Sequence, residues 1–261
     1  MKQIEEVAVT DVTCGIGNVF HNKGAIAAFV KLKARNPSRD NNENPPRAKS
    51  LKMMFLSAHL AAHVKNFEAR DSDFWRISTE MEAQAPEGFL PRRSSIAADD
   101  SENGSFLFDS MDRVFFCGDL NYRLDLPRET AEHEILREGF LGDSVATSAL
   151  MCHDQLVKSM ALRRAFPGFA EGKIEFAPTF KFDKETGDYD TSHKQRIPAF
   201  TDRVLFKPIG TRVIEYASVP GAMHSDHRPV HATFRINMEG KEIALPKPKR
   251  KKKRSKDPTK F

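Results

Sequence analysis

An apolar run that ends abruptly in polar residues constrains this chain more than any other feature. The run is Val114-Phe-Phe-Cys117, and Gly118, Asp119 and Asn121 come directly after it. Its length and composition predict a β-strand covered on both faces, and Gly118 permits close backbone approach at the strand's end. Side chains two positions apart in extended chain point the same way, so we expect Asp119 and Asn121 on one side. Such a pair suits a site that binds a metal or activates water beside a phosphate; the alternative is a turn capped by both side chains.

Further polar motifs stand at the ends of other predicted strands. Asp202 introduces a second apolar run, Asp226-His227 precedes a predicted strand over residues 230–236, and His59 follows a strand over residues 53–56. An Asp beside a His, with another Asp available from a second strand, meets the needs of a general base. One carboxylate can orient the imidazole while the other faces a metal. These motifs together predict one shared site at the ends of several strands.

Six motifs in the chain follow the order found in a known enzyme family. They are Asn22-Lys-Gly24, His59-Leu-Ala-Ala-His63, Gly118-Asp-Leu-Asn-Tyr-Arg123, Pro178-Thr-Phe-Lys-Phe-Asp183, Pro198-Ala-Phe-Thr-Asp-Arg203 and Ser225-Asp-His-Arg-Pro229. The set resembles the catalytic domain of inositol polyphosphate 5-phosphatases, which share the metal-dependent phosphoesterase fold of deoxyribonuclease I. The resemblance runs from about Glu5 to about Ile236 and departs mildly within the motifs. Phe200-Thr201 stands where the family often has Trp-Cys, Phe180 where it often has Tyr, and His21 where it usually has Gly.

The resemblance implies an α+β fold, an α/β sandwich in which two packed, mostly antiparallel sheets are flanked by helices. It also implies that the family's first strands are missing, because the segment from Ile4 to Gly15 aligns with a strand that follows them. Those elements carry an Asn and a Glu, the principal magnesium ligand, so we expect weakened Mg²⁺ binding. We expect residues 1–240 to form a catalytic domain that lacks its N-terminal part, and residues 241–261 to form a disordered polybasic tail.

The resemblance also implies a role for each polar residue at the strand ends. Asp119 would orient the water, Asn121 would hold a phosphate oxygen, and His59 would contact the scissile phosphate. His227 would be the general base or transition-state stabiliser and would be held by Asp202. Asp226 would face the metal. His63 and Asn66 are expected to support this set. Lys181, Lys194 and Arg196 would grip the phosphate adjacent to the one removed, since Arg offers a bidentate fork and Lys a point charge.

The activity implied by the resemblance is magnesium-dependent hydrolysis of a 5-phosphate by in-line attack of activated water. The substrates would be phosphoinositides such as phosphatidylinositol 4,5-bisphosphate, or soluble inositol polyphosphates. A catalytically impaired fragment or pseudoenzyme that binds inositol phosphates is a second hypothesis. A nuclease of the same fold is a third, disfavoured by Tyr122-Arg123 and by the block from Pro178 to Arg203, which are signatures of the phosphatase. Nucleic acid is therefore not the expected partner, and the oligomeric state is left open.

Charge and cysteine content bear on where such a chain works. Its 261 residues carry a net charge of +5, yet residues 247–260 alone hold nine Lys or Arg against Asp257, so the body is slightly acidic. This predicts a disordered tail that attracts an anionic leaflet, acts as a nuclear-import signal, contacts nucleic acid, or is simply solvated. Three widely spaced Cys predict a reducing compartment. We expect a cytoplasmic protein, peripheral at membranes, with the nucleus as the alternative.

The pattern of apolar residues predicts the remaining elements. Strands over residues 25–33 and 51–57 are expected to pair as a hairpin with a long loop at 35–49, and a second loop is expected at 91–105. Helices are expected over residues 67–83, 129–137 and 152–166. In the second of these, Ile135 and Leu136 are expected to face the core.

Overall fold

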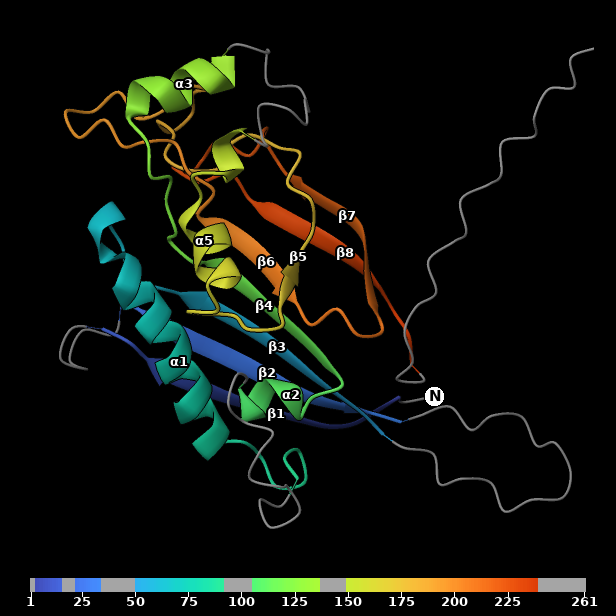
Figure 1. Ribbon diagram of the computed structural model, residues 1–261. Helices are drawn as coiled ribbons and strands as arrows, with labels where there is room; N and C mark the ends of the chain where they lie inside the picture. Colours follow the sequence, from blue (N-terminus) through green and yellow to red (C-terminus); the bar gives the residue numbers. More distant parts are fainter. Residues whose placement is uncertain (1–2, 16–21, 34–49, 92–104, 137–148, 239–261) are drawn as a thin grey trace, which may run out of the picture.

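The computed structural model of the chain describes residues 3–15, 22–33, 50–91, 105–136 and 149–238. Within these ranges six strands form one sheet in the order β1-β2-β3-β4-β6-β5, and β7 and β8 pair as a second sheet (Figure 1). The strands are β1 (Ile4–Thr13), β2 (Gly24–Leu32), β3 (Leu51–His59), β4 (Arg113–Asp119), β5 (Ala170–Glu171), β6 (Asp202–Phe206), β7 (Thr211–Ser218) and β8 (Val230–Ile236). The helices are η2 (Val64–Asn66, a 3₁₀ turn), α1 (Phe67–Ala83), α2 (Phe106–Asp109), α3 (Arg128–Leu136) and α5 (Gln155–Ala161).

The six-stranded sheet is antiparallel except at its centre. The pairs β1–β2, β2–β3, β4–β6 and β5–β6 are antiparallel, whereas β3 and β4 are parallel. A parallel pair brings the ends of two strands to the same edge of a sheet. Because β6 runs antiparallel to β4, its first residue lies at that same edge. The topology therefore collects the last residues of β3 and β4 and the first residue of β6.

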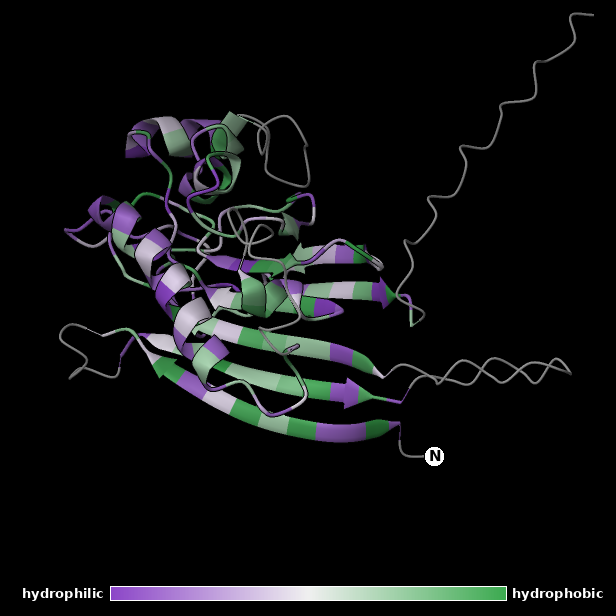
Figure 2. Ribbon diagram, turned by 60° about the horizontal axis from the view of Figure 1, so that its bottom comes forward, coloured by the Kyte–Doolittle hydropathy of each residue, from purple (hydrophilic) through white to green (hydrophobic). Residues whose placement is uncertain are grey.

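One face of this sheet is covered by α1 and α2 (Figure 1). The buried residues of α1 recur every three or four positions, as an amphipathic helix on a core requires: Arg70, Asp71, Phe74, Ile77, Ser78 and Met81. Phe74 packs against Phe166 with ring centroids 4.3 Å apart, and Phe116 of β4 lies 4.9 Å from Phe166. Figure 2 shows largely apolar strands and a helix of mixed polarity. Burial of phenylalanine rings against the sheet thus stabilises this layer.

The opposite face of the sheet packs against β7 and β8. Phe115 of β4 and Phe206 of β6 both contact Phe234 of β8, with ring centroids 4.8 and 5.1 Å apart. These rings form a second core cluster with Leu51 and Met53 of β3. The arrangement confirms the expected two packed sheets of mostly antiparallel strands. The antiparallel pairing of β2 with β3 and the helix over residues 67–83 are confirmed as well.

Two helix predictions need correction. The helix expected over residues 152–166 is shorter and consists of α5 alone. Its start is capped by the Asp154 side chain, which accepts a hydrogen bond from the Val157 amide. Beyond its end, Arg163 has φ 54°, which an α-helix cannot accommodate. In α3, Ile135 is buried as expected. The prediction that Leu136 faces the core is wrong, because this last residue of the helix is 77% exposed.

Some expectations fall on residues that the structure does not describe. They are the loop at 35–49, most of the loop at 91–105, the boundary at residue 240 and the polybasic tail. Within the described part of the chain, no helix is long and apolar enough to cross a membrane.

Candidate active site

Three polar residues stand in a row at the edge where β3, β4 and β6 meet. His59 is paired with Asp119 across β3 and β4, and Asp119 is paired with Asp202 across β4 and β6. The His59 Nε2 lies 3.2 Å from Asp119 Oδ2. The row follows directly from strand register, because each residue is the last or first of its strand. The sheet therefore supplies a rigid base for the site.

Gly118 allows β3 and β4 to approach closely beside this row. Its φ is +126°, and a Cβ at this position would lie 2.1 Å from the carbonyl oxygen of Ala58 on β3. A side chain would clash with that backbone, and few residues other than glycine adopt this φ. The close backbone approach predicted for this glycine is confirmed, and it explains why Asp119 can sit directly beside His59.

Asn121 is brought to Asp119, but not by the expected extended chain. It lies beyond the end of β4 with φ 56°, in the left-handed region. Its Nδ2 donates to Asp119 Oδ2 at 3.1 Å and to the Leu60 carbonyl at 3.1 Å, while its Oδ1 accepts from Arg123 at 2.5 Å. Both amide hydrogens are thus engaged by the chain itself. In this arrangement Asn121 orients the carboxylate of Asp119.

His227 is held by Asp202, as the motif order led us to expect. Its Nδ1 lies 2.9 Å from Asp202 Oδ2, and the hydroxyls of Thr179 and Thr201 donate to the same oxygen, each at 2.9 Å. The ring of Phe180 packs against the imidazole with centroids 4.7 Å apart. Three donors therefore hold the carboxylate in place, and the carboxylate in turn fixes one ring nitrogen of His227. The other nitrogen, Nε2, is left for chemistry.

The surroundings of His227 and Asp119 shift the pKa values of these two groups in opposite directions. Burial alone would lower the pKa of His227, but the hydrogen bond that its Nδ1 donates to Asp202 and the charges of Asp202, Asp119 and Asp226 outweigh that effect and raise the pKa. Burial alone would raise the pKa of Asp119, but the hydrogen bond from His59 and the charges of His227, His59 and Arg123 lower it. The site therefore favours a protonated imidazole beside an ionised carboxylate.

Two cations that were not assigned a role from the sequence also contact residues of the site. Burial lowers the pKa of Arg123 to about 10, and its guanidinium lies 4.4 Å from the centre of the Phe180 ring. Lys23 hydrogen-bonds His59 through its Nζ, and burial lowers its pKa. Both residues occur inside motifs quoted above, in Tyr122-Arg123 and Asn22-Lys23-Gly24. Their position in these motifs is the sequence feature that could have identified them as site residues.

The residues expected to grip a second phosphate lie beside the same edge. Lys181 Nζ is 3.4 Å from Asp226 Oδ2, so these two predicted residues form an ion pair. The backbone of Arg196 is fixed by its amide, which donates to buried Asp190 at 2.8 Å. Burial first, and then the charges of Arg196, Arg123 and Lys194, lower the pKa of His63. Arg196 and Lys194 therefore share a positive environment with His63.

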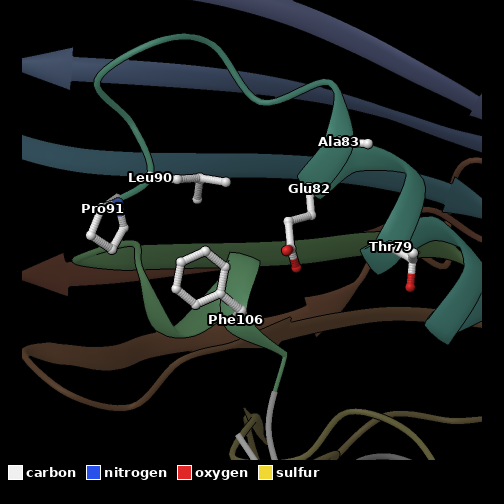
Figure 3. A pocket seen from close by; sticks show the side chains of 6 residues that line it. All are labelled: Thr79, Glu82, Ala83, Leu90, Pro91 and Phe106. Atoms are coloured by element: carbon white, nitrogen blue, oxygen red, sulfur yellow. The ribbon is translucent and has the colours of Figure 1, made fainter. Parts of the chain in front are cut away.

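A shallow cavity elsewhere is not part of this site. It has a volume of about 370 Å³ and lies at the C-terminal end of α1, lined by Thr79, Glu82, Ala83, Leu90, Pro91 and Phe106 (Figure 3). The strand-end residues adjoin the other end of α1, where His63 precedes η2. Figure 3 shows mixed polar and apolar side chains without a cluster of charges that would bind phosphate.

The donors at the strand ends fit a metal ion that is only partly held by protein. Within the described ranges, no group of three or more His, Cys, Asp or Glu side chains is placed to hold a metal. The available hard oxygens are the carboxylates of Asp226, which is about one-third exposed (34%), and of Asp119. Mg²⁺ is often held by one or two carboxylates, with substrate phosphate and water completing its shell. Asp226 and Asp119 are the carboxylates of the site that would contribute to such a shell.

The fold and the site define a phosphoesterase-type domain, and comparison with known proteins identifies its family. The chain belongs to the family described as Endonuclease/Exonuclease/phosphatase family 2, whose model matches residues 1–233. It is 32% identical over 90% of its length to the type II inositol 1,4,5-trisphosphate 5-phosphatase of Mus musculus. It is 34% identical over 91% of its length to the polyphosphatidylinositol phosphatase INP53 of Saccharomyces cerevisiae.

A solved structure shows the same relationship. It is the inositol polyphosphate 5-phosphatase domain of SPsynaptojanin in complex with inositol (1,4)-bisphosphate and calcium ion, with a TM-score of 0.63 and 31% identity over 91% of this chain. The resemblance and the α+β fold inferred from the sequence are thereby confirmed. The chain spans 58% of that solved chain, and about a fifth of the length of the two curated relatives, 20% and 18%.

Proposed function

We propose that this chain carries the site that hydrolyses the 5-phosphate of phosphoinositides or soluble inositol polyphosphates. One observation carries the proposal: the Asp202–His227 pair lies beside an ionised Asp119 at the strand ends, in a chain 31–34% identical to proteins named inositol or phosphoinositide phosphatases. The two carboxylates and the imidazole can handle a proton and a developing negative charge within one small region.

The opposite pKa shifts divide the work between the two central groups. Because its pKa is lowered, Asp119 is ionised near neutral pH and can orient a water molecule by accepting its hydrogen bond. Because its pKa is raised, His227 is biased toward the imidazolium form and can donate from Nε2 to a phosphate oxygen as charge develops. We therefore favour transition-state stabilisation over general-base catalysis as the role of His227.

Asp226 and Asp119 would hold a magnesium ion together with the substrate. Bound there, the ion would act as a Lewis acid toward the phosphoryl group. The side chain of Asp226 has Lys181 as its partner at 3.4 Å, so this lysine neutralises the carboxylate. A magnesium ion bound by Asp226 would take over that neutralisation and leave Lys181 available to a phosphate. Magnesium as the particular metal is part of the proposal.

Substrate selection is assigned to the cations around His63. Lys194 and Arg196 influence the pKa of that imidazole, and Arg123 lies in the same positive environment. A vicinal phosphate carries two charges that a guanidinium fork and an ammonium group can satisfy together. Phe180, which contacts His227, has no hydroxyl to donate. We therefore expect the neighbouring phosphate to be held by charge more than by neutral hydrogen bonds.

Phosphate release tests the proposal. Unaltered protein, His227→Ala and His224→Ala would be supplied with Mg²⁺ and either phosphatidylinositol 4,5-bisphosphate or inositol 1,4,5-trisphosphate. His224 is the matched control because it lies three positions away with a side chain 90% exposed. We expect turnover that His227→Ala abolishes and His224→Ala retains. Tight binding of the trisphosphate without turnover would favour the inositol phosphate-binding hypothesis, and cleavage of DNA instead would favour the nuclease.

We also propose that the protein acts in the cytoplasm and at membrane surfaces. The support is chemical: phosphoinositide head groups are presented by the anionic cytoplasmic leaflet, and one relative is named a polyphosphatidylinositol phosphatase. Fractionation of cells that express the chain, followed by a salt wash of the membranes, would test this location. Recovery of the protein only in the nucleus would contradict it.

A further inference from the structure

Aromatic and basic side chains are in contact where α5 meets the start of α1. Figure 1 shows these two helices as ribbons. The ring of Phe67 lies between two cations, with Lys158 Nζ and the Arg164 guanidinium each 5.6 Å from its centre. Trp75, two turns further along α1, donates from Nε1 to the Arg164 carbonyl at 2.6 Å. Gln155 of α5 also donates from its Nε2 to the Val64 carbonyl of η2 at 3.3 Å. We call the surface formed by η2, the first half of α1 and residues 157–164 the α1–α5 face.

The α1–α5 face leaves apolar side chains in water. The exposed fractions are 38% for Val64, 36% for Trp75, 40% for Val157 and 56% for Leu162. Scattered exposed apolar residues are ordinary on protein surfaces. Here one of them is Trp75, and the face also holds Phe67, whose ring contacts two cations. Trp is enriched where protein meets the membrane–water interface because its ring is apolar and its N–H is polar.

The charge of this face is mainly positive. Lys65, Lys158, Arg163 and Arg164 are all exposed. The acidic groups nearby are Asp125, 3.8 Å from Lys158, and exposed Glu68 in the first turn of α1. Among the residues that the structure describes, Lys65, Arg163 and Arg164 have no carboxylate within ion-pair distance. Four cations against two acids, interleaved with apolar side chains, complement an anionic lipid surface.

The α1–α5 face also adjoins His63, a residue expected to support the candidate active site. Val64 directly follows His63, whose imidazole shares the positive environment of Arg123, Lys194 and Arg196. Buried Arg70 fixes the backbone that leads into η2, since its guanidinium donates to the carbonyls of Ala61 and His63 at 3.0 and 2.7 Å. A bilayer seated on the face would therefore present head groups beside the cations of the site.

We propose that the α1–α5 face docks on an anionic lipid bilayer and orients the site toward phosphoinositide head groups. The orientation of substrate rests on the proposed function, whereas docking itself requires no turnover. Val64, Trp75 and Leu162 enter the interface, and the four cations contact anionic head groups. None of these residues belongs to the polybasic sequence of residues 241–261, so both can contribute to membrane affinity.

Vesicle binding by the full chain tests the docking. The probe is a phosphatidylcholine vesicle with or without phosphatidylserine, free of phosphoinositide, so that no active-site ligand is present. The variants are Lys158→Glu/Arg164→Glu for the charges and Leu162→Asp for the apolar contact. The matched controls are Lys33→Glu and Ile209→Asp, which alter an exposed lysine and an exposed isoleucine (62%) at the opposite edge of the sheet. All five proteins keep the tail, so its contribution is constant.

We expect binding that requires phosphatidylserine and that both face variants weaken at least about tenfold, which corresponds to the loss of only one or two basic contacts. The two controls should bind like the unaltered chain. Equal binding by all proteins would show that the tail alone docks, and would overturn the proposal. So would equal weakening by the control variants, or no binding by the unaltered chain. Docking without any phosphate release would leave this inference standing while rejecting the proposed function.

Discussion

Asp202 Oδ2 lies 2.9 Å from His227 Nδ1, and two threonine hydroxyls donate to that same oxygen. The first residue of β6 thereby fixes an imidazole that belongs to the segment before β8. Asp202 belongs to the six-stranded sheet and His227 lies three residues before β8 of the second sheet, so the contact ties the segment that leads into β8 to the edge of the first sheet. The protonation state of His227 depends on this single carboxylate more than on any other partner.

Removal of that carboxylate charge should lower the pKa of His227. In Asp202→Asn the amide keeps the shape of the side chain but loses the charge, so only the charges of Asp119 and Asp226 are left to oppose the lowering effect of burial. The pKa should fall below its value in the unaltered protein, as read from the imidazole protons by NMR. Asp188→Asn, at an exposed loop position, is the control. An unchanged His227 titration in Asp202→Asn would contradict the assigned coupling.

The raised pKa of His227 should also appear in the dependence of stability on pH. A group whose pKa is higher in the folded than in the unfolded state stabilises the fold fully below its unfolded value, near 6.5 for His. That contribution is lost as pH rises through the folded pKa. The difference in unfolding free energy between the unaltered protein and His227→Gln should therefore shrink from acidic to alkaline pH in urea titrations. A difference that grows with pH would show that the pKa is lowered instead.

The strand ends of the site were predictable because local composition decides them. The run before Gly118 has no polar residue to interrupt a buried strand, and Asp119 must then lie at its edge. The pairing of His59 with Asp119 was not predictable in the same way. It depends on the parallel register of β3 and β4, which are separated by α1 and α2, and sequence periodicity carries no information on which distant strands become neighbours.

Residues that act through backbone conformation were the least predictable. The left-handed φ of Asn121 turns the chain beyond β4, so the two-residue periodicity that placed it beside Asp119 did not apply. The length of α5 was overestimated for a similar reason, because the apolar spacing continues past Arg163 while the helix cannot. Arg123 and Lys23 were visible within motifs, but their importance follows from contacts with Phe180 and His59 that only the tertiary structure makes.

Gly118 should tolerate substitution poorly. Gly118→Ala would place a Cβ 2.1 Å from the Ala58 carbonyl and impose φ +126° on an alanine, so β3 and β4 would have to separate. A strained conformation of this kind costs about 1–3 kcal/mol, and the clash adds to it. Gly187→Ala is the matched control, since nothing lies within 4 Å of its built Cβ. Urea unfolding should show a large loss for the first variant and little change for the second, and similar losses would contradict the close-approach argument.

Arg196 should affect substrate choice more than metal dependence. Its backbone is tied to buried Asp190, while its charge acts on His63 among the other cations of the site. In Arg196→Ala, kcat/KM should fall for substrates that carry both the 4- and the 5-phosphate. A lost charge-assisted contact of about 1.5–3 kcal/mol corresponds to roughly 10- to 150-fold. Substrates without the 4-phosphate should lose much less, and the Mg²⁺ concentration that gives half-maximal rate should stay the same. Lys184→Ala, at an exposed lysine of the same loop, serves as the control. Equal loss on both classes of substrate would mean that Arg196 supports the reacting phosphate itself, and the assignment of this residue to selectivity would have to be abandoned.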